Sequence, residues 1–408
     1  MTDARPPRGP LVALGVLSIV AFGGWFYGFG VLLEPIRQDT GWAETTLTST
    51  YGASLFLTGL GAAVGGAVID RRGGRTLLVG AGVLAGAALV ATSFATSPAA
   101  FAVAGAVAGG TIGAGGYYHA TQAIIGRLAP EARTRGMTAL TLWGAFASPV
   151  FLPLLGWTVT AYGWRPTVRG LAVAVAFAFL AAAATIPADR VDRDATGRPS
   201  AFAALRRTAD DRVVGRLYLS GLAAGIGTSV LLLYQVPAMV AAGLSLGVAS
   251  SLAGARGVVQ LGGRIPLPPV VRRFGSYLAL RVSLVLAAVG ALLLPFAGDL
   301  PTAVTFTAVA GVAIGALAAL EGIYAGDVTA HEVLGTTLGA YSLVRGIGSA
   351  VGPVLGGLLA DAVGSRGPTL ALSAVALVTA ALVLRRPQAE GPADQSVAWP
   401  DPVAGTGP

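Results

Sequence analysis

The sequence predicts an all-α membrane protein with twelve transmembrane helices in two six-helix bundles. Of the 408 residues, 54% are hydrophobic and only 11% are charged, and the mean hydropathy is +0.73. Soluble domains carry about 25% charged residues, so this composition excludes a soluble enzyme and a disordered protein. Long apolar runs recur along the chain, and arginines gather in the short gaps between them.

The apolar runs set the expected number of spans. A helix needs roughly 20 apolar residues to cross a bilayer, and open sheets cannot exist in lipid. The first run is too long for a signal peptide, and no cleavage site follows it. We expect spans at about 11–34, 46–69, 76–95, 98–127, 136–159, 167–187, 213–241, 246–271, 276–297, 301–326, 334–360 and 367–385.

The arginines predict the orientation of these spans. With the N-terminus inside, nineteen arginines lie in inner segments, whereas the outer segments hold only Arg37, Arg165, Arg169 and Arg366. Cytoplasmic loops carry such an excess of positive charge, so we expect a multi-pass protein of the cytoplasmic (plasma) membrane with both termini cytoplasmic. This placement explains the net charge of +8 without nucleic acid as a partner.

The polar segments predict the domain organisation. We expect an N-terminal bundle at 1–187, a charged cytoplasmic linker at 188–212, a C-terminal bundle at 213–386 and a disordered cytoplasmic tail at 387–408. The halves read as imperfect repeats that align on Gly73 and Gly275. Parallel repeats of this kind are typical of transporters.

Three arginines fall inside predicted spans, namely Arg256, Arg264 and Arg345. An arginine at mid-bilayer costs about 2.5–3.5 kcal/mol on insertion scales, so these side chains must face water or an anion. The clear acid within a span is Glu321, nearer the inner end of its own span. We therefore interpret the arginines as anion ligands near the midplane, with an internal ion pair as the alternative.

The fourth span supplies further candidate ligands. Tyr117, Tyr118 and His119 could orient a carboxylate and carry a proton, although a polar patch satisfied between helices is an equally simple interpretation. Tyr27 in the first span is a weaker candidate for the same cavity.

The segment GAVIDRRGGR, which covers 66–75, predicts a conformational switch. Gly66 would let the second span approach the eleventh, and Gly73 falls in the following turn. Asp70 with Arg71 and Arg75 would form a charge cluster at the cytoplasmic mouth that is made in one conformation and released in another. A positive-inside loop with a chance aspartate is the simpler alternative.

This segment resembles the loop-2/3 motif of the major facilitator superfamily, and PEARTRG at 130–136 and the Gly-Pro pair of the eleventh span support the resemblance. Within that superfamily, four stretches resemble the monocarboxylate transporter and oxalate/formate antiporter branch, namely 27–42, 113–136, 235–264 and 341–346. The resemblance implies the twelve-helix major facilitator fold and transport of carboxylates.

The resemblance also implies roles for individual residues. Arg264 stands where the branch binds carboxylates through an arginine of the eighth span. Gln260 stands where monocarboxylate carriers commonly have an aspartate, which argues against simple proton–lactate symport. Arg345, in the stretch that begins at Tyr341, stands where oxalate antiporters have a lysine, which favours an anion with more than one carboxylate.

The sequence thus predicts a secondary active transporter of a small organic mono- or dicarboxylate that works by alternating access. Protons or a counter-anion would couple to the flux, and we expect a monomer. A proton-coupled multidrug or metabolite exporter is the alternative, and a membrane sensor that binds without transporting is a second. We expect no catalysis and no cofactor, and the absence of cysteine and the distance between His119 and His331 argue against a metal site.

Overall fold

A computed structural model describes residues 6–188, 212–329 and 334–386, and every regular element in these ranges is helical. The N-terminal bundle contains α1 (Arg8–Ala21), the π-helix η1 (Phe22–Tyr27), α2 (Phe29–Thr40), α3 (Glu44–Arg72), α4 (Gly74–Phe94), α5 (Pro98–Gly116), α6 (Tyr118–Leu128), the short 3-10 helix η2 (Pro130–Ala132), α7 (Arg133–Gly144), α8 (Ala147–Tyr162) and α9 (Trp164–Thr185). The C-terminal bundle contains α11 (Arg212–Ala241), α12 (Leu246–Arg264), α13 (Leu267–Leu293), the 3-10 helix η3 (Leu294–Phe296), α14 (Leu300–Val328), α15 (Leu334–Val363) and α16 (Gly367–Val383). Most of the predicted linker and all of the predicted tail lie outside the described residues.

Ten helical segments of the described chain are long and apolar enough to cross a membrane, and α16 is apolar but shorter. The remaining predicted span corresponds to α12, which is 19 residues long and carries Arg256 and Arg264. Gly275, whose φ of 78° and ψ of 157° are not helical, interrupts α13 within the gap predicted between 271 and 276. The predicted span 246–271 also contains a break that was not predicted, because α12 ends at Arg264, two residues before Pro266, which cannot donate a backbone hydrogen bond.

Backbone geometry supports the internal repeat. All six glycines with positive φ in the described chain fall into three pairs, separated by 202, 202 and 201 positions, at loops where a side chain would strain the backbone. These pairs are Gly41 with Gly243, Gly73 with Gly275, and Gly163 with Gly364. The alignment of the halves on Gly73 and Gly275 therefore matches equivalent turns.

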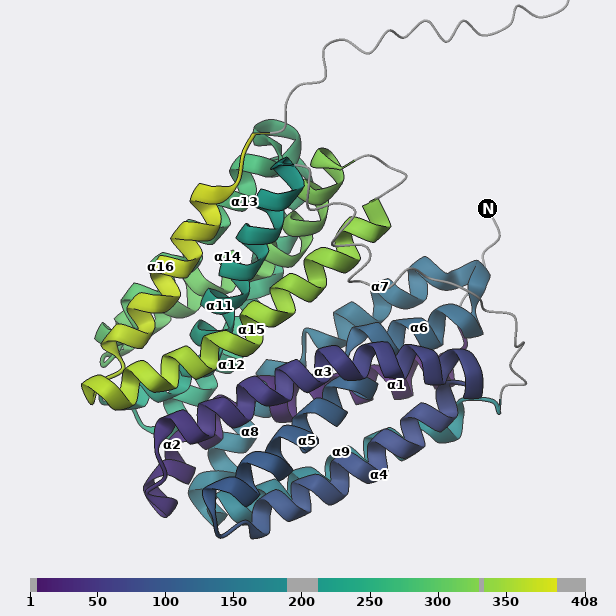
Figure 1. Cartoon of the computed structure of the whole chain (residues 1–408), viewed down its shortest axis with the longest axis horizontal. Coiled ribbons are helices and arrows are strands. Elements are labelled where there is room, and N and C mark those ends of the chain that lie inside the picture. The colour runs from purple at the N-terminus through teal and green to yellow at the C-terminus, as the bar shows by residue number, and fades with distance from the viewer. Residues whose placement is uncertain (1–5, 189–211, 330–333, 387–408) are drawn as a thin grey trace, which may run out of the picture.

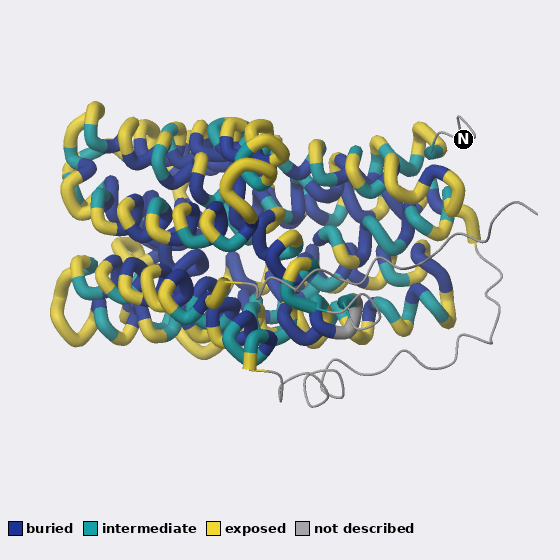
Figure 2. Tube along the Cα trace, turned by 90° about the horizontal axis from the view of Figure 1, so that it is seen from above, coloured by how far each residue is buried: buried dark blue, intermediate teal, exposed yellow. Residues whose placement is uncertain are grey.

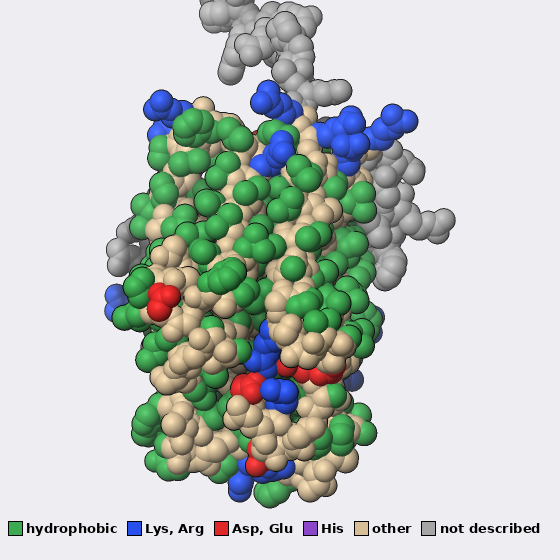
Figure 3. Space-filling model, turned by 90° about the vertical axis from the view of Figure 1, so that its left-hand side faces the viewer, with side chains coloured by type: hydrophobic (Ala, Val, Ile, Leu, Met, Phe, Trp, Pro, Cys, Tyr) green, Lys and Arg blue, Asp and Glu red, His purple; other side chains and the backbone are tan. Residues whose placement is uncertain are grey.

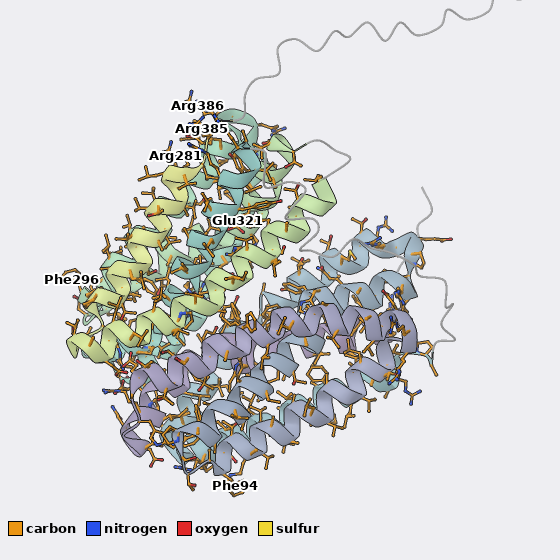
Figure 4. The ribbon with its side chains drawn as sticks, in the orientation of Figure 1. Phe94, Arg281, Phe296, Glu321, Arg385 and Arg386 are labelled. Carbon is orange, nitrogen blue, oxygen red and sulfur yellow. The ribbon has the colours of Figure 1, made fainter. Side chains whose placement is uncertain are left out.

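The two bundles meet at one end and diverge toward the other (Figure 1). Their contacts join α3 to α15, α8 to α12, and α2 to α11. A Cβ added at Gly52 would lie 2.4 Å from the carbonyl oxygen of Ala350, and one at Gly357 would lie 2.0 Å from Thr48 Oγ1. We call this the contact end. The diverging end carries both described chain ends and, as Figure 4 shows, Arg385 and Arg386, so we call it the arginine-rich end.

The outer flanks of both bundles suit contact with lipid. Buried residues face inward between the helices, and exposed ones lie on the rims (Figure 2). Large apolar side chains such as Val103, Val173 and Phe177 are exposed. Figure 3 shows a flank dominated by hydrophobic side chains, with charged groups gathered at the chain end and near the junction of the bundles. This distribution is that of a protein whose solvent is the bilayer.

Candidate functional site

The first span is interrupted by a π-helix. Residues 22–27 (FGGWFY) form η1, in which the backbone hydrogen bonds are displaced by one residue. The hydroxyl of Tyr51 on α3 donates a 2.7 Å hydrogen bond to the carbonyl oxygen of Phe26, which satisfies one group at the distortion. Insertions of this type are frequent at functional sites, so η1 indicates a candidate site at this depth of the bundle.

A second break divides the fourth span between α5 and α6. Tyr117 adopts an extended conformation there, and its ring stacks on Phe22 of η1 with centroids 4.2 Å apart. The ring of Tyr118 lies 4.7 Å from Phe22, and Phe26 contacts Tyr27 at 4.9 Å. The two backbone breaks thus bring together an aromatic cluster of Phe22, Phe26, Tyr27, Tyr117 and Tyr118. Sequence reasoning identified its tyrosines and missed its phenylalanines, because phenylalanine in an apolar span carries no polar signal.

The polar atoms of this cluster differ in their environment. The hydroxyl of Tyr117 is buried without a hydrogen-bond partner, whereas that of Tyr118 donates to the carbonyl oxygen of Thr141 at 3.4 Å. His119 is exposed, and its Nε2 lies 3.2 Å from the carbonyl oxygen of Ala114. Two of the three predicted ligands in this span therefore belong to the aromatic cluster, and His119 lies on another face of α6.

Arg256 lies between the bundles at the depth of η1. Its Nε donates a 2.8 Å hydrogen bond to Gln235 Oε1 on α11, and its guanidinium carbon lies 5.8 Å from the centre of the Tyr27 ring. The side chain is 0% exposed, and neither Nη1 nor Nη2 has a hydrogen-bond partner. No carboxylate pairs with Arg256 among the described residues.

Arg264 ends α12, eight residues nearer the arginine-rich end. Its Nε donates to the carbonyl oxygen of Gly315 on α14 at 3.1 Å, and the side chain is half-buried. The guanidinium lies close enough to the Tyr118 hydroxyl of the other bundle for the two to interact electrostatically. Within the described chain no acidic side chain pairs with Arg264, as the sequence predicted.

Arg345 requires a correction, because its side chain is paired with an acid. Its Nε lies 3.1 Å from Glu321 Oε2, and its Nη2 donates to Thr228 Oγ1 at 3.4 Å. The prediction placed Glu321 nearer the inner end of its span and preferred an anion as the partner of Arg345. In the folded bundle α14 and α15 are neighbours, and Figure 4 shows Glu321 inside the C-terminal bundle. The internal ion pair, left open as the alternative, is what forms.

Gln260 and Tyr341 are both buried in helix contacts. The backbone of Gln260 faces Gly315, because a Cβ added at Gly315 would lie 2.1 Å from the carbonyl oxygen of Gln260. The side-chain Nε2 of Gln260 is buried and has no hydrogen-bond partner. The ring of Tyr341 packs against Gly221 of α11, and its hydroxyl interacts electrostatically with Arg345 and Glu321. Tyr341 therefore belongs to the ion pair, whereas Gln260 lies between helices α12 and α14.

The predicted charge cluster of the 66–75 segment also has different partners. Asp70 pairs with Arg127 of α6, which also donates to the carbonyl oxygen of Ile69 at 3.1 Å. Arg71 and Arg75 are exposed and take no part in this pair. The reason is geometric, because Asp70 lies on the last turn of α3 with its carboxylate toward α6. Gly73 forms the turn as predicted, with φ of 84°.

Gly66 does not lie where the second and eleventh spans touch. A Cβ added at Gly66 would meet no atom within 4 Å, whereas Gly52 and Gly357 make the close approach of α3 to α15 at the contact end. The second and eleventh spans do approach each other as predicted. In this conformation, however, they touch at the contact end, whereas the motif lies at the opposite end of α3.

A network of charges at the contact end was not predicted. Arg366, in the turn before α16, donates from Nη2 to Glu44 Oε2 at 2.9 Å and also pairs with Glu34 of α2. The backbone nitrogens of Glu44 and Thr45 donate to Asp361 at the end of α15, at 3.0 and 2.7 Å. These contacts join the bundles. The sequence shows the charges but not which residues of distant segments meet.

Electrostatics reinforce this network. Burial opposes the charge on Arg366, but the hydrogen bonds and charges of Glu44 and Glu34 outweigh it and raise the pKa of Arg366 above its ordinary value. A cavity of about 500 Å³ adjoins the network, lined in part by Arg37 and Asp361. The described residues contain no group of three His, Asp or Glu side chains able to hold a metal ion.

Comparisons with known proteins agree with this architecture. Residues 14–238 and 217–404 match the family model described as Major Facilitator Superfamily. No curated protein sequence matches the chain. The crystal structure of a mutant of the nucleoside transporter NupG is similar, with a TM-score of 0.75 at 13% identity over 92% of this chain and 98% of that one. The crystal structure of nucleoside transporter NupG gives a TM-score of 0.73 at 15% identity over 91% and 97% of the two chains.

Proposed function

Because this chain belongs to the major facilitator superfamily, we propose that it is a secondary active transporter that carries a small organic anion across the cytoplasmic membrane by alternating access. The arginine-rich end would face the cytoplasm, following the positive-inside rule. The protein would act as a monomer, with protons or a counter-anion as coupling ions.

One observation carries the anion assignment. Arg256 and Arg264 lie within one helix between the bundles, and neither has a carboxylate partner among the described residues. A guanidinium withdrawn from water without a counter-charge is costly, so an arginine retained there favours an anionic ligand. Arginine also presents two parallel donors that match a carboxylate.

The two bundles would share the ligand. Arg264 would bind a carboxylate from the C-terminal bundle, and Tyr118 would donate its hydroxyl from the N-terminal bundle. An anion held by both would offset the cost of enclosing the charge, and would thereby favour rocking of one bundle against the other. Arg345 would not bind substrate while Glu321 neutralises it.

Uptake by membrane vesicles tests this proposal. Radiolabelled lactate, oxalate and succinate are offered to vesicles containing the wild type, Arg264→Gln or Arg281→Gln. Arg281 is a matched control because its Nη1 donates to the Tyr277 hydroxyl at the edge of the C-terminal bundle. We expect Arg264→Gln to reduce uptake by at least 10-fold and Arg281→Gln to preserve it. Equal uptake by all three proteins would reject the role of Arg264.

A second candidate is proton-coupled transport of an uncharged polar solute or drug. The pair of Glu321 with Arg345 favours it, because a carboxylate in a membrane helix can take up a proton and release its arginine. The similar fold of a nucleoside transporter makes uridine a useful probe, alongside a panel of drugs. Proton-dependent uptake of uridine, with no uptake of carboxylates, would favour this candidate.

A further inference from the structure

We infer that Arg256 is a separate anion subsite that receives a carboxylate arriving from the contact end, before the substrate reaches Arg264. This inference rests on the proposed function and assigns a sidedness to its binding site. It follows from the hydrogen-bonding state of Arg256, its position along α12 and the conformation of the two bundles.

The local geometry leaves two of the three guanidinium nitrogens available. Gln235 Oε1 accepts the hydrogen bond of Nε and so fixes the plane of the group. The Tyr27 ring approaches the guanidinium from the other bundle. Nη1 and Nη2 remain without partners although they are buried. Two neighbouring nitrogens of this kind match the two oxygens of a single carboxylate.

Burial without a counter-charge indicates that this conformation is not the one in which the subsite fills from solution. The side chain is fully enclosed while the contact end is shut. Two contacts shut it nearby: a Cβ added at Gly156 of α8 would lie 2.1 Å from Ser250 Oγ, and one at Gly254 would lie 3.0 Å from Pro153. Separation of α8 from α12 would hydrate Arg256 and admit an anion.

The position along α12 gives the direction of entry. The helix starts at the contact end, and Arg256 precedes Arg264 by eight residues, or about 12 Å at 1.5 Å per residue. Arg264 is half-buried in the same conformation that encloses Arg256. The two arginines are thus exposed in turn. Arg264 is exposed when the bundles are separated at the arginine-rich end, and Arg256 is exposed when they are separated at the contact end.

Sided transport kinetics test the inference. Uptake of lactate, oxalate and succinate is measured in right-side-out and in inverted membrane vesicles for wild type, Arg256→Gln, Arg256→Lys and the control Arg281→Gln. We expect Arg256→Gln to raise the KM for entry from the contact end at least 10-fold and to change the KM from the arginine-rich end less than 3-fold. Arg256→Lys keeps the charge but not the paired nitrogens. Its KM for entry from the contact end should therefore lie between the values of the wild type and Arg256→Gln.

Thermal unfolding of the purified full chain gives a second readout. Loss of an uncompensated buried charge should raise the unfolding midpoint of Arg256→Gln without ligand, and should remove part of the stabilisation by carboxylates. A lower midpoint for this variant, or an equal change of KM from both sides, would overturn the inference while leaving carboxylate transport intact. If carboxylates raise the unfolding midpoint of the wild type more than that of Arg256→Gln, but the wild type does not transport them, the proposed function is wrong and the binding of carboxylates at Arg256 is still supported.

Discussion

Arg366 and Glu44 join the two bundles at the contact end, with Arg366 Nε 3.1 and 3.2 Å from the two carboxylate oxygens of Glu44. The repeat places Arg165 in the position equivalent to Arg366, 201 residues earlier, and Arg165 pairs within its own bundle with Asp39. The residue equivalent to Asp39 in the C-terminal half is Ala241, which lines the neighbouring cavity. Arg366 therefore lacks an equivalent of Asp39 in its own bundle, and it pairs with Glu34 and Glu44 of the other one.

Arg366→Gln should open the contact end. Removing one partner of a buried pair costs about 3 kcal/mol, which shifts the conformational equilibrium roughly 100-fold. The chain has no cysteine, so a single Ser250→Cys reports on separation of α8 from α12 through its reaction with a membrane-impermeant maleimide. We expect labelling to become much faster when Arg366→Gln is added.

Arg165→Gln is the matched control for this prediction. It removes the equivalent arginine, but the pair that it breaks lies within one bundle. Labelling of Ser250→Cys should therefore stay slow. If both substitutions accelerate labelling equally, the effect comes from general loosening of the fold and not from the contact between Arg366 and Glu44.

Much of the fold follows from the sequence, because apolar runs, arginine-rich loops and repeated turns are local features. Gly73 and Gly275 could be aligned since each closely follows a pair of arginines at the end of an apolar run. The unpaired state of Arg264 was also predicted, from the scarcity of acids nearby. By contrast, Glu321 and Arg345 lie 24 residues apart on separate helices, and only the packing of α14 beside α15 brings them together.

The break at η1 was not predicted for a similar reason. Its sequence, FGGWFY, is compatible with an ordinary helix, and the group that satisfies the Phe26 carbonyl oxygen at the distortion, Tyr51, comes from another helix. The partners of Arg366 likewise depend on how the bundles meet. Sequence patterns therefore indicated which residue types mattered for the candidate site, whereas tertiary packing decided which of them are paired and which remain free.

Glu321→Gln should separate proton coupling from substrate exchange. The change removes the negative partner of Arg345, whose side chain is 28% exposed, so the cost should be about 2 kcal/mol, below that of a fully buried pair. If Glu321 carries the coupled proton, uptake driven by a pH gradient is lost, while exchange of labelled for unlabelled substrate persists. Gradient-driven uptake at the wild-type rate would exclude Glu321 as the proton site.

Asp70→Asn should affect transport more than stability. Asp70 and Arg127 are 41% and 45% exposed, and ion pairs of this kind contribute about 0–1 kcal/mol to the free energy of unfolding. We expect a small change in the thermal midpoint and, if the pair helps to hold one conformation, at least a 5-fold change in kcat. A large fall in the midpoint with unchanged kcat per folded protein would instead assign the pair a structural role.

Gly66→Leu should block closure of the arginine-rich end. Gly52, Gly59 and Gly66 recur every seven residues on α3, and at about 100° per residue Gly66 lies within about 40° of the face of Gly52. Gly52 contacts α15 at the contact end, whereas added Cβ atoms at Gly59 and Gly66 would meet nothing. When the arginine-rich end closes, the free part of this face is the surface available for close approach to α15.

A leucine at position 66 therefore fits the conformation described and clashes in the opposite one. The thermal midpoint should change little, while transport falls at least 10-fold and Ser250→Cys becomes harder to label, because the contact end stays shut. Gly80→Leu is the control, since Gly80 of α4 also has open space around it but lies on the outer flank. Wild-type transport by Gly66→Leu would show that closure does not bring this face of α3 against α15.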